Sequence, residues 1–377
     1  MIIALRMLLY FGLIAIMSAP AMAAQPFVHP GVLHTRPELE RMKRSVNSGI
    51  EPWKGGFEKL AADSFSAADW RIRGPFEMSS RDSRDLTHHT EFWTDSNAAY
   101  QNALMWFITG EEAHAMKSAE ILDAWSTTLK EIKGRDAILA ASLYGDKLVN
   151  AAEILRYTYK GWTPQETEQC SHLFRDILYP VIKDFATFAN GNWDTGCIKT
   201  MMGFGIFLDD RTMFDRAVDY YRHGSGNGSL THYILFDTGQ CQESGRDQQH
   251  TQLGIGHLVE ACEIAWSQGI DLYSLDDNRL LKGLEYTAKY NLGNDVPFTP
   301  YTDPAKQSPA TVISEQGRGR LRAIWEMAWN HYGVRKRLPA PYTRQAAEKL
   351  RPEGPGFQAD HPGYGTLLFT IQTSGRR

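Results

Sequence analysis

Cysteine is scarce in this chain of 377 residues, and its spacing excludes several kinds of site. The four cysteines lie far apart and form no Cys-x-x-Cys pair: Cys170, Cys197, Cys241 and Cys262. This spacing argues against a structural zinc site. Four thiols in a chain of this length do not make a disulfide framework, so free buried thiols are at least as well supported as disulfides. A His-Glu-x-x-His motif is also absent, and we expect neither a metal site nor a cofactor.

The chain has no strong excess of charge of either sign. It contains 40 Lys and Arg against 44 Asp and Glu, a net charge of -4, and it has no run of basic residues. That balance argues against nucleic acid or an anionic membrane surface as the partner. A small anionic ligand or an anionic polymer remains possible if arginines and histidines gather in one cleft.

Long apolar runs are absent beyond the first residues. Arg6 precedes an apolar run over 7–17, and the small residues of Ala21-Met-Ala23 follow, which is the pattern of a cleaved secretory signal peptide. The run is too short to span a bilayer comfortably. We therefore expect a signal peptide at 1–23 and a mature protein of 24–377 that is periplasmic or secreted, without a membrane partner after cleavage.

Strand-like segments are few, and helical periodicity dominates from about residue 37 to 350. The two exceptions are 230–236 and 364–372, which we predict as strands. Helices are expected in two segments flanked by capping signals, at 113–122 and 146–159, and in these further segments: 95–108, 164–189 with a kink at Pro180, 194–207, 210–222, 250–267, 277–291 and 318–332. Helical hairpins in series without alternating strands predict an all-α toroid, and no composition shift divides 24–377 into two domains.

Two segments predict helix starts through their capping chemistry. Thr163-Pro-Gln-Glu166 has the spacing of a capping box with proline at the first helical position. Thr109-Gly-Glu-Glu112 has the same spacing and precedes apolar positions at helical intervals. Both segments therefore predict turns between antiparallel helices.

The segment Glu243-Ser-Gly-Arg-Asp-Gln-Gln-His250 concentrates polar groups in a glycine-containing turn that leads into a helix. His250, at the helix start, is a candidate catalytic residue, whereas His257 fits a hydrogen-bonded core histidine better. Arg246 can bind a ligand carboxylate through paired hydrogen bonds. The alternative is that it forms a salt bridge with Glu243 or Asp247 within the protein. Gln249 is a candidate substrate contact.

Asn192 and Trp193 form a second candidate pair at the start of another expected helix. The amide can donate to a ligand while the indole stacks on a sugar ring, and the alternative is that Asn192 caps the helix. Further candidate substrate contacts lie in a polar and aromatic loop: Arg81, Arg84, His88, His89 and Trp93. Tyr301, between Pro300 and Thr302, is held on a proline-stiffened loop that can aim its phenol.

Six segments make the chain resemble bacterial polysaccharide lyases of the alginate lyase superfamily, closest to polysaccharide lyase family 38. They are His29-Pro-Gly-Val-Leu-His, Ala98-Ala-Tyr-Gln-Asn-Ala-Leu-Met-Trp, Asn150-Ala-Ala-Glu-Ile-Leu-Arg, Gly191-Asn-Trp, Glu243-Ser-Gly-Arg-Asp-Gln-Gln-His and His361-Pro-Gly-Tyr-Gly-Thr-Leu. The resemblance implies an (α/α) toroid whose cleft cuts anionic uronate polysaccharides by β-elimination with an Asn, a His, an Arg and a Tyr. The Asn-Asn-His-Ser-Tyr-Trp pattern of family 5 is missing.

The resemblance transfers the four roles to Asn192, His250, Arg246 and Tyr301. Tyr290 and Tyr286 compete for the tyrosine, and Arg318 and Arg320 compete for the arginine. In β-1,4-linked mannuronate or glucuronate, H5 and O4 lie on the same ring face, so one tyrosine can act as both base and acid there. The transferred set therefore predicts polymannuronate or glucuronan as the first substrate to test.

Two other functions remain open on sequence grounds. A hydrolase on a similar toroid would use paired carboxylates such as Asp194 and Asp247. A glycan-binding protein without activity would hold chains on its aromatic side chains; the sequence has 10 Trp, 16 Tyr and 17 Phe.

Overall fold

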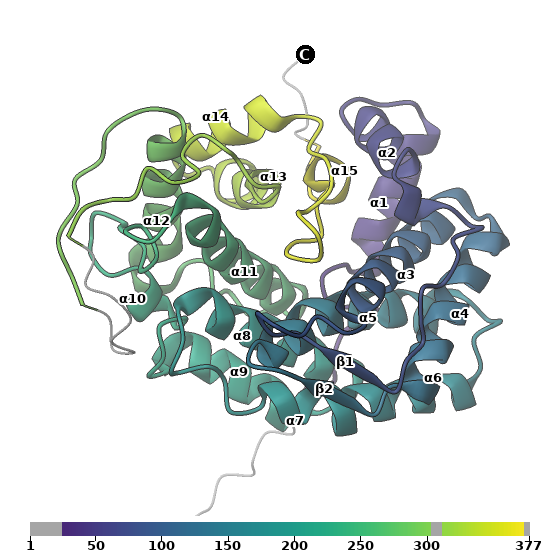
Figure 1. Ribbon diagram of the computed structural model, residues 1–377. Helices are drawn as coiled ribbons and strands as arrows, with labels where there is room; N and C mark the ends of the chain where they lie inside the picture. Colours follow the sequence, from purple (N-terminus) through teal and green to yellow (C-terminus); the bar gives the residue numbers. More distant parts are fainter. Residues whose placement is uncertain (1–24, 303–310, 373–377) are drawn as a thin grey trace, which may run out of the picture.

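The computed structural model describes residues 25–302 and 311–372, and its regular secondary structure is almost entirely helical (Figure 1). Its longer helices are α1 (Arg36–Asn47), α2 (Trp53–Ala61), α3 (His89–Thr109), α4 (Glu112–Thr128), α5 (Ala137–Thr158), α6 (Pro164–His172), α8 (Gly191–Phe207), α9 (Arg211–His223), α11 (Gln248–Ser267), α12 (Leu275–Asn291) and α14 (Pro341–Leu350). The short ones are α7 (Tyr179–Ile182), α10 (Leu230–Tyr233), α13 (Trp325–Trp329) and α15 (Gly365–Leu368). A 3-10 turn covers Ser64–Ser66, and π-helical turns cover Leu173–Leu178 and Asn330–Arg335.

The helices form an inner and an outer layer of a ring. Helices α3, α5, α8 and α11 contact one another in that order, and α4, α9 and α12 pack outside them. The inner helix α5 is buried without interruption over 139–155, as expected for a helix covered on every side. Helix α15 contacts α1 and α2, which brings the end of the described chain back to its beginning (Figure 1). The prediction of an all-α toroid is confirmed.

Both predicted strands are wrong. Residues 230–233 form α10, where the N–H of Tyr233 donates to the carbonyl of Ser229 at 2.8 Å. Residues 365–368 form α15. Ile234 forms one isolated antiparallel bridge with Cys241, but neither segment has a neighbouring strand, so α10 and α15 close local hydrogen bonds instead. The two strands of the described chain are three residues long, β1 (Met78–Ser80) and β2 (Glu131–Lys133), and they pair in parallel. A segment of three residues is too short for its alternation to be recognised.

The capping signals had different outcomes. Thr163 forms the predicted capping box, because its hydroxyl accepts from the N–H of Glu166 at 3.3 Å and its own N–H donates to the Glu166 carboxylate at 2.6 Å. Thr109 does not start a helix. It ends α3, and its hydroxyl accepts the N–H of Glu111 in the turn before α4.

Two predicted helices are shorter than expected. The segment 164–189 contains α6, a π-helical turn and α7, which follow one another without a break and end at Ile182, and Pro180 lies directly after the π-helical turn. The segment 318–332 becomes helical only at Trp325. The four cysteines are buried and form no disulfide, as one of the two alternatives predicted. Within 25–302 and 311–372, no helix is long and apolar enough to cross a bilayer.

A cluster of charged side chains is buried between the inner helices. The Lys199 ammonium lies 3.1 Å from the Asp146 carboxylate and 2.5 Å from the Glu260 carboxylate, and Lys147 lies 3.1 Å from Asp146. His361 contacts the other Glu260 oxygen through Nδ1 at 2.6 Å. Each of these side chains is at most 3% exposed, so each charge depends on its partners for compensation. We call these five residues the buried charge cluster.

The stability of the fold depends on pH through the carboxyl group of Glu353. Burial and the nearby charge of Glu326 raise the pKa of Glu353 to about 8, although backbone N–H donors oppose the shift. The folded protein therefore holds this proton up to a higher pH than the unfolded chain does. The raised pKa of Glu353 contributes fully to the free energy of unfolding below pH 4.5, the ordinary pKa of a glutamate. This contribution is lost as the pH rises to about 8.

We expect the free energy of unfolding to fall over that pH range by up to about 1.4 kcal/mol per unit. Urea denaturation of the wild type and of Glu353→Gln between about pH 5 and pH 8 measures the effect. Gln keeps an acceptor for the N–H of Trp325, which donates to Glu353 at 3.0 Å, and it does not titrate. The variant should have the flatter profile, and parallel profiles would contradict this assignment.

Candidate active site

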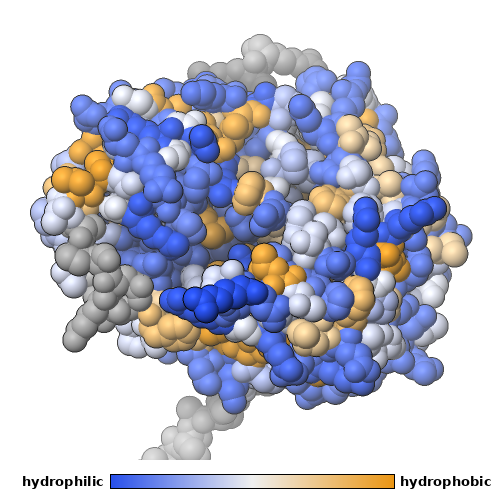
Figure 2. Space-filling model, in the orientation of Figure 1, coloured by the Kyte–Doolittle hydropathy of each residue, from blue (hydrophilic) through white to orange (hydrophobic). Residues whose placement is uncertain are grey.

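A cleft of about 560 Å³ opens where the N-terminal ends of α8 and α11 meet the start of α5 and the loop before α15. Its walls contain these residues: Arg81, Arg135, Asp136, Leu139, Leu143, Phe188, Ala189, Asn190, Asn192, Trp193, Arg246, His250, Leu253, Arg322, Phe357, Gln358 and Asp360. Figure 2 shows a hollow in the middle of one face of the molecule with a mostly hydrophilic rim. The cleft is therefore polar and open to solvent.

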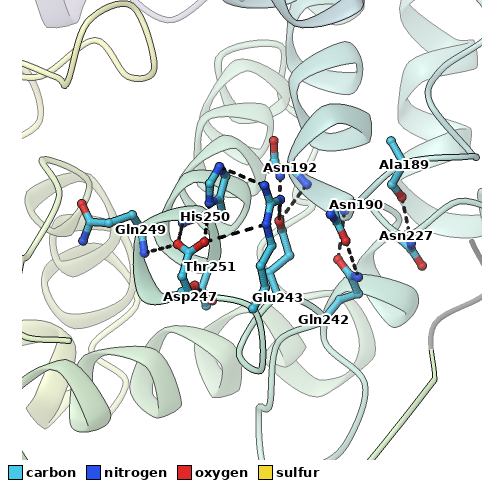
Figure 3. A network of polar contacts seen from close by, with 12 residues as sticks. Ala189, Asn190, Asn192, Asn227, Gln242, Glu243, Asp247, Gln249, His250 and Thr251 are labelled. Carbon is cyan, nitrogen blue, oxygen red and sulfur yellow. Dashed lines mark hydrogen bonds and ion pairs between the residues drawn. The ribbon is translucent and has the colours of Figure 1, made fainter. Parts of the chain in front are cut away.

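A continuous chain of polar contacts runs through one wall of the cleft (Figure 3). His250 Nδ1 lies 2.6 Å from Asp247 Oδ2, and His250 Nε2 lies 3.2 Å from Arg246 Nη2. Arg246 Nη1 donates to Glu243 Oε1 at 2.8 Å. The same carboxylate accepts from Nδ2 of Asn192 at 2.7 Å and from its backbone N–H at 2.9 Å. The catalytic candidates Asn192, Arg246 and His250 therefore form one connected group.

Local backbone structure places these side chains. Asp247 caps α11, because its Oδ1 accepts from the N–H groups of Gln249 and His250 at 2.9 and 2.8 Å. The same carboxylate thus fixes both the helix start and the imidazole of His250. Asn192 lies inside α8, whose cap is Asn190, so the alternative role of Asn192 as a cap is wrong. At Gly191, a side chain would collide with the ring of Tyr233, at 2.4 Å, which explains the glycine before Asn192.

The two carboxylates differ in their protonation behaviour. Burial raises the pKa of Glu243, although Arg246, His250 and the hydrogen bond from Asn192 act in the opposite direction. Burial also raises the pKa of Asp247, but the hydrogen bonds and charge of His250 and the charge of Arg246 outweigh it, so the net pKa is lowered. Asp247 is therefore anionic at neutral pH, and it favours the imidazole tautomer that carries its proton on Nδ1.

Four arginines line the cleft and make it suitable for a polyanion. Arg81 and Arg135 lie on one side, Arg246 lies in the polar chain, and Arg322 lies 3.5 Å from the Asp360 carboxylate and 4.3 Å from the centre of the Phe357 ring. Guanidinium groups pair with carboxylates through matched hydrogen bonds. The cleft therefore concentrates guanidinium groups, two of which are paired with Glu243 and Asp360 in this structure.

Sequence reasoning missed Arg135 and Arg322. Arg322 follows the two arginines that were weighed instead, in the run Gly317-Arg-Gly-Arg-Leu-Arg. Arg318 stacks on the ring of Tyr290 at 4.0 Å, and Arg320 has an exposed side chain, while Arg322 points into the cleft. The run of arginines predicted a basic turn, but only the folded structure shows that Arg322 is the one that faces the cleft.

The predicted substrate contacts divide into two groups. Trp193 and Arg81 line the cleft. Five others lie elsewhere: Arg84, His88, His89, Trp93 and Gln249. Arg84 is exposed and His88 stacks on Phe76. His89 lies behind the wall, 2.7 Å from the hydroxyl of Tyr144.

Trp93 and Gln249 have other surroundings. Trp93 lines a separate cavity of about 140 Å³ beside α3. The Gln249 amide donates to the carbonyls of Gly317 and Arg320, so this side chain holds the neighbouring loop in place. Its predicted role as a substrate contact stays a prediction, as do the roles of the other four.

Tyr301 does not line the cleft. Its loop is fastened beside the Gly239–Cys241 turn, since Gln240 donates to the carbonyl of Thr299 and accepts the Thr299 N–H at 2.9 and 2.7 Å. Tyr301 is close enough to Tyr233 to contribute to the raised pKa of that phenol, after burial and nearer charges. Tyr233 donates to the carbonyl of Thr251 in α11, so Tyr301 belongs to the same flank as His250. Its catalytic role stays a prediction.

The competing tyrosines have other roles. Tyr286 donates to the carbonyl of Pro297, and Tyr290 lies under Arg318. Tyr286 lines a second groove, of about 440 Å³, between α12 and α14, which has mainly apolar walls. Across the described ranges, no group of three or more His, Cys, Asp or Glu side chains is arranged to hold a metal ion.

Comparisons with known proteins agree with this architecture. An alginate lyase from Bacteroides ovatus is 14% identical with a TM-score of 0.60, covering 92% of this chain and 100% of that chain. Alginate lyase A1-III from Sphingomonas species A1 is 15% identical with a TM-score of 0.62, covering 89% and 95%. A histidine-to-alanine variant of alginate lyase A1-III complexed with a tetrasaccharide is 15% identical with a TM-score of 0.66, covering 89% and 94%.

These structures share the toroid at low identity, and no curated protein matches the chain. The family itself is identified by a sequence model, since the alginate lyase model matches residues 71–298. That range holds most of the inner helices and the polar chain from Asn192 to His250. The chain therefore belongs to the alginate lyase family of polysaccharide lyases.

Proposed function

We propose that this protein cleaves β-1,4-linked uronate polymers by β-elimination, with polymannuronate or glucuronan as its first substrate. The observation that carries the proposal is the contact of a guanidinium with an imidazole, 3.2 Å apart, held between two carboxylates in a cleft with four arginines. Membership of the alginate lyase family and the tetrasaccharide bound by a structural neighbour support a polysaccharide substrate. Placement in family 38 stays a prediction.

The first requirement of the reaction is to offset the charge of the substrate carboxylate. Removal of the C5 proton puts a second negative charge into that group, and prearranged donors lower the cost. Arg246 supplies a guanidinium, and Asn192 has one amide hydrogen on Glu243 and a second for the substrate. Arg81 and Arg135 are our proposed contacts for the carboxylates of neighbouring sugars, whereas Arg322 would first have to leave its ion pair with Asp360.

The second requirement is proton transfer. A base takes the C5 proton, the electron pair left on C5 forms the C4=C5 double bond, the C4–O4 bond breaks, and O4 receives a proton. The sequence prediction gave Tyr301 both the base and the acid role on these substrates; we instead propose His250 as the base that removes the C5 proton, because its ring lines the cleft and Tyr301 does not. Since H5 and O4 share a ring face in these sugars, His250 and Tyr301 would act from the same side of the ring. Tyr301 remains our proposed donor to O4; it lies outside the cleft lining, so this role requires its phenol to move toward the bound sugar.

One of the two carboxylates that a hydrolase would need, Asp194, does not reach the cleft. Asp194 is fully buried and accepts from the N–H of Ala186 at 2.7 Å, the hydroxyl of Tyr220 at 3.0 Å and the N–H of Gly228 at 3.2 Å. These contacts hold a loop together, and Asp194 does not line the cleft. It therefore lacks the access to substrate that a glycosidase carboxylate needs.

The experiment is an ultraviolet absorbance assay on polymannuronate, polyguluronate, glucuronan and hyaluronan, run beside an assay for new reducing ends. We expect absorbance and reducing ends to rise together, because each elimination creates a conjugated C4=C5 bond and a new reducing end. The rate should be highest on polymannuronate or glucuronan. New reducing ends without absorbance would show a hydrolase. Binding without either signal would show a glycan-binding protein. Tyr301→Phe in the same assay tests the donor to O4.

Export of the protein also stays a proposal. The signal-like segment 1–23 lies outside the described residues, and a periplasmic or secreted location rests on its sequence pattern alone.

A further inference from the structure

Both ring nitrogens of His250 are occupied in the protein without substrate. Nδ1 faces Asp247 Oδ2 at 2.6 Å, and Nε2 faces Arg246 Nη2 at 3.2 Å (Figure 3). Asp247 Oδ2 can only accept, so Nδ1 carries a proton, and the contact of Nε2 with a guanidinium, which has no acceptor, is a hydrogen bond only if Nε2 is unprotonated. A guanidinium can only donate. Arg246 therefore donates to the same lone pair that a C5 proton would have to reach.

Arg246 is placed to exchange this contact for another. Its Nη1 is held by the buried Glu243, while the side chain as a whole is 38% exposed and borders the cleft. Nη2 can thus turn from His250 toward a ligand while Nη1 stays bound. A carboxylate is a stronger acceptor for a guanidinium than a neutral imidazole nitrogen, because the bond joins opposite charges.

We propose that Arg246 is a substrate-operated cover on the catalytic base: the uronate carboxylate takes the Arg246 Nη2 donor away from His250 and so frees the Nε2 lone pair for the C5 proton. This inference rests on the proposed function for its final step. The cover itself is a property of the free protein. It can therefore be tested without any elimination being measured.

If Arg246 covers His250 in this way, the substrate carboxylate is needed for removal of the C5 proton as well as for binding. A neutral sugar offers no strong acceptor, so the base stays covered. A methyl-esterified uronate is the informative case, because esterification makes the C5 proton intrinsically more acidic and yet removes the charge that draws Arg246 away. The wild type should therefore prefer the acid, against the intrinsic order of reactivity.

The first experiment labels His250 in the free protein with diethyl pyrocarbonate, which reacts with unprotonated imidazole nitrogen. Labelling at about pH 8, where an ordinary imidazole is neutral, is followed by mass spectrometry of the peptide that contains His250. Arg246→Gln should label roughly tenfold faster than the wild type, since it lacks a charged hydrogen bond to Nε2. Arg135→Gln is the matched control, because it removes the same charge from the same cleft without contacting His250.

Equal rates in the wild type and in Arg246→Gln would overturn the proposal, as would equal acceleration in the control. If Arg246→Gln does not fold, Arg246→Lys serves instead. The guanidinium uses separate nitrogens for its two contacts, Nη1 for Glu243 and Nη2 for His250, whereas lysine has one terminal nitrogen. The charge of Glu243 should hold that ammonium, so this variant should also label faster.

The second experiment compares acid and methyl-ester substrates. The ratio of ester to acid cleavage should rise at least tenfold in Arg246→Gln relative to the wild type, because only the acid has lost a partner. An unchanged ratio would contradict the exchange of partners. If labelling accelerates but no uronate is cleaved by the wild type, the proposed function fails while the cover on His250 stands.

Discussion

Replacing His250 by alanine is expected to lower kcat for elimination by about 10²–10⁴, the usual contribution of a general base. KM should change little, because Arg246 keeps its bond to Glu243 and remains available to the substrate carboxylate. Initial rates of ultraviolet absorbance on polymannuronate over a range of concentrations separate the two constants.

The matched control for this prediction is His172→Ala. His172 lies on the outer helix α6, where it pairs with Asp176 and is exposed, so its loss should leave both constants as they are. A variant at position 250 that kept wild-type kcat would show that another group removes the C5 proton. Tyr301 would then be the first residue to test.

Replacing Lys199 by methionine is expected to destabilise the protein by about 3–5 kcal/mol. Lys199 is the only one of the two lysines in the buried charge cluster that contacts both Asp146 and Glu260. Without it, Glu260 keeps its contact with His361, but burial lowers the pKa of that imidazole, so it compensates the carboxylate less well than an ammonium does. Urea denaturation measures the loss.

A surface pair provides the control for the lysine variant. Lys130 lies 2.5 Å from the Glu77 carboxylate, the same separation as Lys199 and Glu260, but both side chains are about two-thirds exposed. Water already solvates this pair, so Lys130→Met should cost less than about 1 kcal/mol. Similar losses in the two variants would mean that burial does not determine the strength of the cluster.

Local chemistry made part of the fold predictable. Thr163 and Glu166 form a cap from residues next to each other in the chain, so their spacing was sufficient. The toroid followed from helical hairpins in series. Residues 230–236 were misjudged because strand propensity counts only where a partner strand is present, and that is decided by distant parts of the chain.

The same distinction applies to the site. Arg246 and His250 lie four residues apart across a helix start, and sequence reasoning placed them together correctly. Asn192 joins them through Glu243, which the sequence suggested only as a salt-bridge partner. Arg322 faces the cleft because of contacts with Asp360 and Phe357, both far along the chain, and no local pattern indicates that.

The most direct test of the central claim is a crystal structure of His250→Ala with a mannuronate tetrasaccharide. Our account predicts one sugar with its carboxylate within hydrogen-bonding distance of Arg246 and Asn192, and with C5 facing the space that the imidazole occupied. Other carboxylates of the chain should contact Arg81, Arg135 or Arg322. A tetrasaccharide bound in the groove beside Tyr286, or one in the cleft whose carboxylates all point away from Arg246, would contradict the assignment of this site.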